Sequence, residues 1–160
     1  MTIIELQMGA NGSYNKTLGR IKAIDRTHRE FHDRVDNHKI LLLNENQEHV
    51  SLPVNSNSES TIYLGAKKIG DDAVEVSTIG IYENHKLVGQ IDLKFDKNGD
   101  YIPYEKGNKN SSHFHYFKTD PNTGKVSRKS HDKTNTHPID SKWHKLCNDV
   151  ADYNKSQRNK

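Results

Sequence analysis

The strongest constraint on the fold is a series of short β-rich runs that begins at residue 61. TIYLGAKKI, AVEVSTIGIY and LVGQIDLKF follow one another across GDD and ENHK, and YIPYE follows DKNGD. Two to five polar residues between β-rich segments are the usual spacing of hairpins. The pattern therefore predicts an antiparallel meander, or a small barrel-like sheet, as the main structure of the chain.

The same pattern continues into HFHYF and KVSRK, which flank the sequence DPNTG at residues 120–124. Pro121 restricts φ to the range of a type I turn, and Gly124 accepts a positive φ at the exit. We therefore expect a hairpin at this point. Four further strands are predicted upstream from apolar or alternating runs: IIELQM (3–8), LGRIKAI (18–24), EFHDRV (30–35) and KILLL (39–43).

The C-terminal segment predicts a single amphipathic helix. Its apolar residues recur at the spacing of one helix face: Trp143, Leu146, Cys147, Val150 and Tyr153. Asp140 or Ser141 is placed to cap the first exposed amides. Asn154 is expected on the helix surface, and the polar residues 155–160 are expected to fray. The fold class is thus mostly β (α+β), with one C-terminal amphipathic helix.

A single β-rich domain over residues 1–154 is expected. Residues 44–60, NENQEHVSLPVNSNSES, are polar and lack periodicity, which predicts an exposed, flexible loop within it. The lone cysteine, Cys147, cannot form an intrachain disulfide, which fits a reducing compartment. No apolar run approaches the roughly 20 residues of a membrane span. A soluble, cytoplasmic protein without membrane association is therefore expected.

Positive charge is concentrated in the C-terminal third. Residues 1–104 hold 12 Lys/Arg against 15 Asp/Glu, whereas residues 105–160 hold 12 against 6. Such a region suits phosphates or an acidic partner, and equally a solvated tail. Aromatic residues among cations can stack bases and neutralise phosphates, which favours a partner that is nucleic acid or a host nucleic-acid-binding protein. The candidate binding residues are Tyr116, Lys118, Lys125, Arg128 and Lys129.

His113 and His115 are one residue apart, so a β-strand directs both imidazoles to one face, expected to be exposed, and Phe114 to the core. Two histidines on one strand can hold a transition metal such as zinc, but a stable site usually needs further ligands. His131 and His137 are the candidates for these. The spacing matches no standard zinc pattern, so a strand surface without a cofactor is the favoured interpretation.

The same two histidines support a catalytic alternative. His113 and His115 would act as acid and base of a nuclease or phosphodiesterase, with or without a metal, and nearby cations would hold the phosphate. No nucleophile, carboxylate pair or phosphate loop stands out, so the sequence favours binding over catalysis. A third hypothesis is sequestration of a nucleotide messenger in a pocket between subunits, which leaves a homo-oligomer open.

Two stretches together carry a family resemblance. NGSYNKTLGRI (11–21) and HFHYF (113–117) resemble small uncharacterised proteins of bacteriophages and integrating elements of Gram-positive bacteria. The match covers about a tenth of the chain, and residues 22–112 depart from the shorter members. The resemblance implies a setting, that of cytosolic accessory proteins of mobile DNA, among which inhibitors of host defence nucleases are common. It implies no active site.

Overall fold

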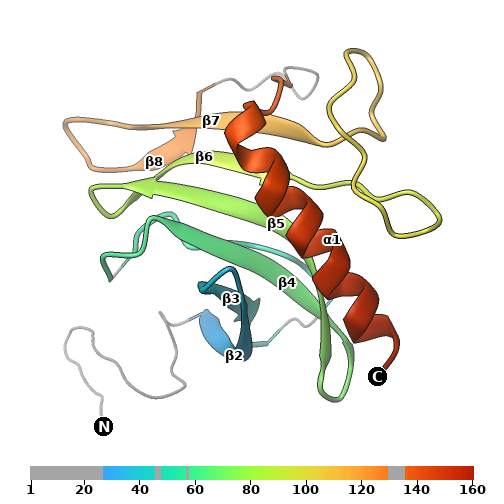
Figure 1. The fold of residues 1–160 in the computed structure, drawn as a ribbon. Helices are drawn as coiled ribbons and strands as arrows, with labels where there is room; N and C mark the ends of the chain where they lie inside the picture. Colours follow the sequence, from blue (N-terminus) through green and yellow to red (C-terminus); the bar gives the residue numbers. More distant parts are fainter. Residues whose placement is uncertain (1–26, 46–47, 57, 130–135) are drawn as a thin grey trace, which may run out of the picture.

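The computed structural model describes residues 27–45, 48–56, 58–129 and 136–160. Within them, one sheet has the strand order β2-β3-β4-β5-β6-β7-β8, and one helix crosses it (Figure 1). The strands are β2 (His28–Val35), β3 (His38–Leu43), β4 (Ile62–Gly70), β5 (Ala73–Glu83), β6 (Lys86–Asp92), β7 (His113–Thr119) and β8 (Val126–Arg128). A 3-10 turn, η1 (Ser141–Trp143), leads into helix α1 (His144–Arg158). The prediction of a mostly β fold with one C-terminal helix is confirmed.

The sheet departs from the predicted meander at one pair of strands. β3 and β4 are parallel, whereas all other neighbouring strands of the described sheet are antiparallel. A parallel pair needs a connection of about a dozen residues or more, and the polar segment between Leu43 and Ile62 provides it. The sheet is also open, with β2 and β8 at its edges, so the barrel-like alternative is wrong. The predicted strands at 3–8 and 18–24 lie outside the described residues.

Two-residue turns join β2 to β3 and β5 to β6. Asp36 and Asn37 have φ angles of 50° and 69°, and Asn84 and His85 have φ angles of 50° and 66°. Positive φ at both central residues is typical of a type I′ turn, whose twist matches that of the flanking strands. These turns explain why such short polar segments reverse the chain.

The predicted hairpin across DPNTG is confirmed. β7 and β8 pair antiparallel, and the backbone N–H of Asp120 donates to the carbonyl of Lys125 at 2.8 Å. Gly124 has a φ of 73°, as its position in the turn requires. The predicted strand YIPYE, in contrast, is wrong: only Tyr101 forms an isolated bridge. Pro103 has no N–H to donate to a ladder, which disfavours a strand there.

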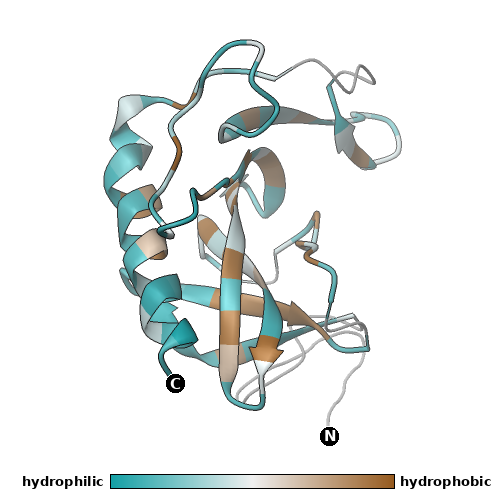
Figure 2. Cartoon of the chain, turned by 90° about the vertical axis from the view of Figure 1, so that its right-hand side faces the viewer, coloured by the Kyte–Doolittle hydropathy of each residue, from teal (hydrophilic) through white to brown (hydrophobic). Residues whose placement is uncertain are grey.

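The main core lies between the sheet and α1, whose apolar residues face the strands (Figure 2). Leu146, Cys147, Val150 and Ala151 of the helix are buried against strand residues that include Ile91. Asp140 caps the helical segment, because its carboxylate accepts from the backbone N–H of Lys142 at 3.0 Å. The predicted apolar face of the helix is therefore correct.

A second, smaller core lies on the other face of the sheet, where the described part of the 44–60 segment packs. Leu52 is buried in it, and the hydroxyl of Tyr82 donates to the carbonyl of Pro53 at 2.6 Å. A Cβ at Gly80 would lie 2.7 Å from Cδ1 of Leu52, so the lack of a side chain at Gly80 allows Leu52 to pack this closely. The segment has little regular secondary structure, as predicted, but several of its residues are buried rather than exposed.

The end of α1 differs from the sequence prediction. Asn154 and Gln157 are 1% and 3% exposed, and the helix continues to Arg158, so neither a surface Asn154 nor a frayed tail from residue 155 is observed. The amide of Asn154 accepts from the backbone N–H of Val76 at 2.9 Å and donates to its carbonyl at 2.8 Å. Gln157 accepts from the N–H of Val74 at 3.2 Å.

These hydrogen bonds compensate for a missing strand. β6 pairs only with residues 78–83 of β5, so the earlier part of β5 lacks a β6 partner. Unpaired backbone groups that are buried cost free energy, so a polar side chain that reaches them is favourable there. The side chains of Asn154 and Gln157 take the place of that strand.

Replacement of Asn154 by Ala tests this role. We expect a loss of about 2–4 kcal/mol in the free energy of unfolding, because each buried group left unsatisfied costs about 1–3 kcal/mol. Asn148→Ala is the matched control on the same helix, since Asn148 is exposed and its loss should cost less than about 0.5 kcal/mol. Urea denaturation of both variants provides the measurement. Equal stabilities would contradict the assignment.

Candidate functional site

The pairing of β6 with β7 brings together three side chains that are distant in sequence. Asp92 is the cross-strand partner of His113, and Gln90 is the partner of His115. Alternate residues of a strand share a face, so Asp92, His113 and His115 project from the same side of the sheet. That side is opposite α1, because Phe114 packs into the core beneath the helix.

The three side chains form a compact cluster, which we call the Asp92–His cluster. Oδ2 of Asp92 lies 3.1 Å from Nε2 of His115 and 3.4 Å from Nε2 of His113. The two imidazole rings are nearly perpendicular, with their centroids 4.8 Å apart. The ligand atoms of all three residues lie within 4.8 Å of one another. One carboxylate oxygen is therefore the common neighbour of both rings.

Further hydrogen bonds orient the cluster from outside. The side-chain amide of Gln90 donates to Oδ1 of Asp92 at 2.8 Å. Nδ1 of His113 lies 3.1 Å from the carbonyl oxygen of Ser111. Gln90 thus turns Oδ2 of Asp92 toward the rings, and the Ser111 carbonyl favours a proton on Nδ1 of His113.

The hydrogen bonds of the cluster favour the negatively charged form of Asp92 and the positively charged form of His113. Burial alone would raise the pKa of Asp92, but hydrogen bonds from His113, His115 and Gln90 outweigh it and hold the pKa well below its usual range. The hydrogen bond to Asp92 in turn raises the pKa of His113 despite burial. A negative carboxylate is therefore maintained beside two imidazoles.

The predicted direction of the histidines is correct, but their expected exposure is not. His113 and His115 share one face and Phe114 takes the other, as the alternation predicts. Their side chains are only 15% and 9% exposed, so they do not lie on an open strand surface. Asp92 is the most accessible member of the cluster, at 27%.

The other two predicted metal ligands do not join the cluster. His137 forms a bridge with Phe114, and its ring packs edge-on against Tyr116 at a centroid distance of 5.0 Å. It therefore lies against the opposite face of β7. His131 lies outside the described residues. The third ligand-type group is instead Asp92, which the sequence reasoning missed; its only signal was a polar residue alternating with Gln90 in an otherwise apolar run.

The candidate binding residues lie on different faces of the β7–β8 hairpin. Tyr116 is 46% exposed, and Nζ of Lys129 lies 5.6 Å from the centre of its ring. Lys118 alternates with Tyr116 and so shares its face, whereas Arg128 pairs with Phe117 on the other face. Lys125 is exposed beside the turn.

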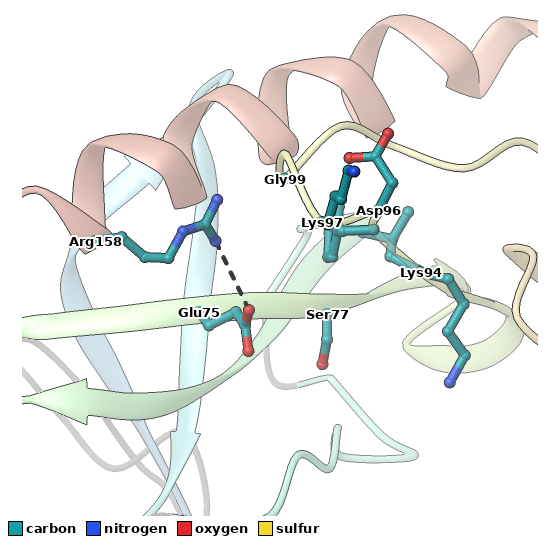
Figure 3. Close-up of a pocket in the computed structure, with 9 residues that line it drawn as sticks. Glu75, Ser77, Lys94, Asp96, Lys97, Gly99 and Arg158 are labelled. Carbon is teal, nitrogen blue, oxygen red and sulfur yellow. Dashed lines mark ion pairs between the residues drawn. The ribbon is translucent and has the colours of Figure 1, made fainter.

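One pocket in the described structure lies apart from both groups, between β5, the loop after β6 and the end of α1 (Figure 3). It has a volume of about 370 Å³. Its charged lining is of both signs, and Arg158 faces Glu75 across it at 4.0 Å. Because these charges compensate each other, the pocket shows no clear preference for a ligand.

Comparison with known proteins returns no match: no family model fits the sequence, and no curated protein or solved structure is significantly similar. Among the described residues, no helix has the length and apolar character needed to cross a membrane.

The Asp92 carboxylate should control the titration of His113. In chelator-treated protein, Asp92→Asn is expected to lower the pKa of His113 toward its ordinary value of 6.5, because the charged hydrogen-bond partner is removed. Stability from this pair is fully present below about pH 6.5 and is lost as pH rises through the raised pKa of His113. The stability difference between wild type and variant should therefore shrink as pH rises above about 6.5 and through the raised pKa of His113.

Imidazole proton shifts followed by NMR against pH measure this effect. His32 provides the internal control, because its pKa is raised by Asp72 on another part of the sheet and should not respond to Asp92→Asn. An unchanged His113 titration in the variant would show that the two side chains do not interact in solution.

Proposed function

We propose that this protein binds single-stranded nucleic acid through the face of the β7–β8 hairpin that carries Tyr116, Lys118 and Lys129, here called the Tyr116 face. The observation that carries the proposal is an exposed aromatic ring flanked by a lysine, with Lys129 5.6 Å from the ring centre. An aromatic ring stacks with any base, and neighbouring cations neutralise the backbone phosphates.

The charge of the hairpin supports an anionic partner. Residues 113–129 contain four Lys/Arg and one Asp, a net charge of +3, which equals the formal net charge of the whole chain. The one acid, Asp120, is occupied by the turn, where its carboxylate accepts from the N–H of Asn122 at 2.7 Å. Among the described residues, none of the four cations forms an ion pair within 4.0 Å.

The ring is also held in place before any partner arrives. Tyr116 packs against Phe114 at a centroid distance of 4.8 Å and against His137 at 5.0 Å. Both contacts restrict its rotation while 46% of the residue stays exposed. A pre-positioned ring loses little entropy when a base stacks on it, which favours binding. Because stacking needs an unpaired base, a single strand suits the surface better than a duplex.

Binding without cleavage fits this geometry better than the nuclease alternative. Tyr116 and the two histidines lie on opposite faces of β7, and the histidines are largely buried. A strand stacked on Tyr116 therefore lies away from His113 and His115. We propose an accessory role in which the protein covers or sequesters a strand, in keeping with the mobile-element setting that the sequence resemblance implies.

Loss of the ring tests the proposal. Fluorescence anisotropy with a labelled single-stranded oligonucleotide should show binding that Tyr116→Ala weakens about tenfold, since stacking contributes about 1–3 kcal/mol per base. Tyr116→Phe keeps the ring and should retain binding. The oligonucleotide should also be recovered intact with and without EDTA. Absence of binding, or equal affinity of Tyr116→Ala and wild type, would refute the proposal, and cleavage that requires His115 would support the nuclease instead.

The lysines of the Tyr116 face should determine the salt dependence. Lys129→Ala is expected to reduce the slope of log K against log salt by about 0.7, the value for one phosphate contact to a single strand. Arg128→Ala is the matched control, because it removes the same charge from the opposite face of the hairpin. It should change affinity less than about twofold. Equal effects of the two variants would indicate nonspecific attraction to the basic region.

A further inference from the structure

We propose that Asp92, His113 and His115 form a binding site for one divalent transition-metal ion of the zinc type. The proposal is independent of nucleic-acid binding, because the cluster lies on the other face of β7 from Tyr116. Two imidazoles and one carboxylate are a ligand set that zinc commonly takes in proteins.

The distances between the ligand atoms match such a site. Ligands about 2.0–2.1 Å from a tetrahedral zinc ion lie roughly 3.3–3.4 Å from one another. Oδ2 of Asp92 lies 3.4 Å from Nε2 of His113 and 3.1 Å from Nε2 of His115. Only small side-chain adjustments are needed to place one ion between the three groups, whose ligand atoms all lie within 4.8 Å of each other.

Both ring nitrogens of His113 face hydrogen-bond acceptors, and this arrangement favours a cation beside the ring. Nδ1 faces the carbonyl oxygen of Ser111 at 3.1 Å, and Nε2 faces the carboxylate of Asp92 at 3.4 Å. Both neighbours are acceptors, but a neutral imidazole has only one N–H to donate. A proton on Nδ1 therefore leaves a lone pair on Nε2 pointing at a carboxylate. A second proton on His113 or a metal ion between the two groups removes that repulsion, and the metal ion also binds Nε2 of His115 once that nitrogen has released its proton.

The surroundings are those of a prepared ligand set. A metal-binding histidine usually donates its other ring N–H to a carbonyl, as His113 can to Ser111. A ligating carboxylate is itself usually hydrogen-bonded, and Gln90 donates to the remaining oxygen of Asp92 at 2.8 Å. The β6–β7 ladder fixes the spacing of all three ligands. Little reorganisation is therefore required on binding.

The burial of the ligands suggests how the ion would be reached. The side chains of His113 and His115 are 15% and 9% exposed, whereas Asp92 is 27% exposed. Access is therefore from the side of the carboxylate. Three protein ligands leave a fourth position for water or another small ligand, as in zinc sites that do chemistry rather than closed structural sites.

The experiment uses the full chain after removal of metals with a chelator. Titration with Zn²⁺ against a chromophoric competitor should give one site per chain, and Co²⁺ should produce the visible absorption of a tetrahedral complex. His115→Gln, His113→Gln and Asp92→Asn should each weaken Zn²⁺ binding at least tenfold, the effect expected from removal of one ligand. Circular dichroism confirms that each variant is folded.

Two matched variants localise the site. His32→Gln removes a histidine that also contacts two carboxylates, Asp33 and Asp72, but on an exposed surface. His137→Gln removes the histidine beside Tyr116. Both should leave Zn²⁺ affinity unchanged within about twofold, whereas loss of binding in either would place the ion elsewhere.

Wild-type NMR keeps the test decisive if a ligand variant fails to fold. Addition of one equivalent of Zn²⁺ should shift the imidazole nitrogen signals of His113 and His115 and leave that of His32 in place. Absence of these shifts together with no Zn²⁺ binding at millimolar concentration would overturn the proposal.

Discussion

The fold depends on how hydrogen-bond partners are supplied to the part of β5 that does not pair with β6. β6 pairs with residues 78–83 of β5, and earlier in β5 the N–H of Val74 and the N–H and carbonyl of Val76 would be buried without a β6 partner. Asn154 and Gln157 of α1 bind the backbone of Val76 and Val74 there, and the apolar face of the helix covers the adjacent core. The helix is thereby fixed on one face of the sheet, so the opposite face of β6 and β7 is left for the Asp92–His cluster.

Much of this arrangement follows from sequence patterns that act locally. The two-residue periodicity of HFHYF correctly separates Phe114 from His113 and His115, and the helical spacing correctly gives the buried residues of α1. The sequence places Asn154 on the helix surface, because a polar residue on a helix indicates exposure unless a buried partner is known. Its partner is the β5 backbone, 78 residues away, and only the tertiary structure supplies it.

The candidate site was predictable only in part, because its residues combine a local pattern with a contact between strands that are distant in sequence. The histidine pair is visible in one strand, but Asp92 reaches it only through the register of β6 against β7, which are separated by residues 93–112. No local pattern encodes that register. Likewise, the sequence does not distinguish Arg128 from Lys129, because each is simply one positive charge of the basic region. The pairing of Arg128 with Phe117 is what assigns the two cations to different faces of the hairpin.

The two faces of β7 are connected through the strand that carries them both and through its pairing with β6. Four residue pairs join β7 to β6, from Gly89–Tyr116 to Asp92–His113, and the Asp92–His cluster lies at one end of that ladder. At the other end, a Cβ on Gly89 would lie 2.3 Å from the Phe114 ring, so the glycine allows that ring to pack closely under the strand. Phe114 in turn supports Tyr116. A change in the β6–β7 register would therefore displace both the Asp92–His cluster and the ring that supports the Tyr116 face.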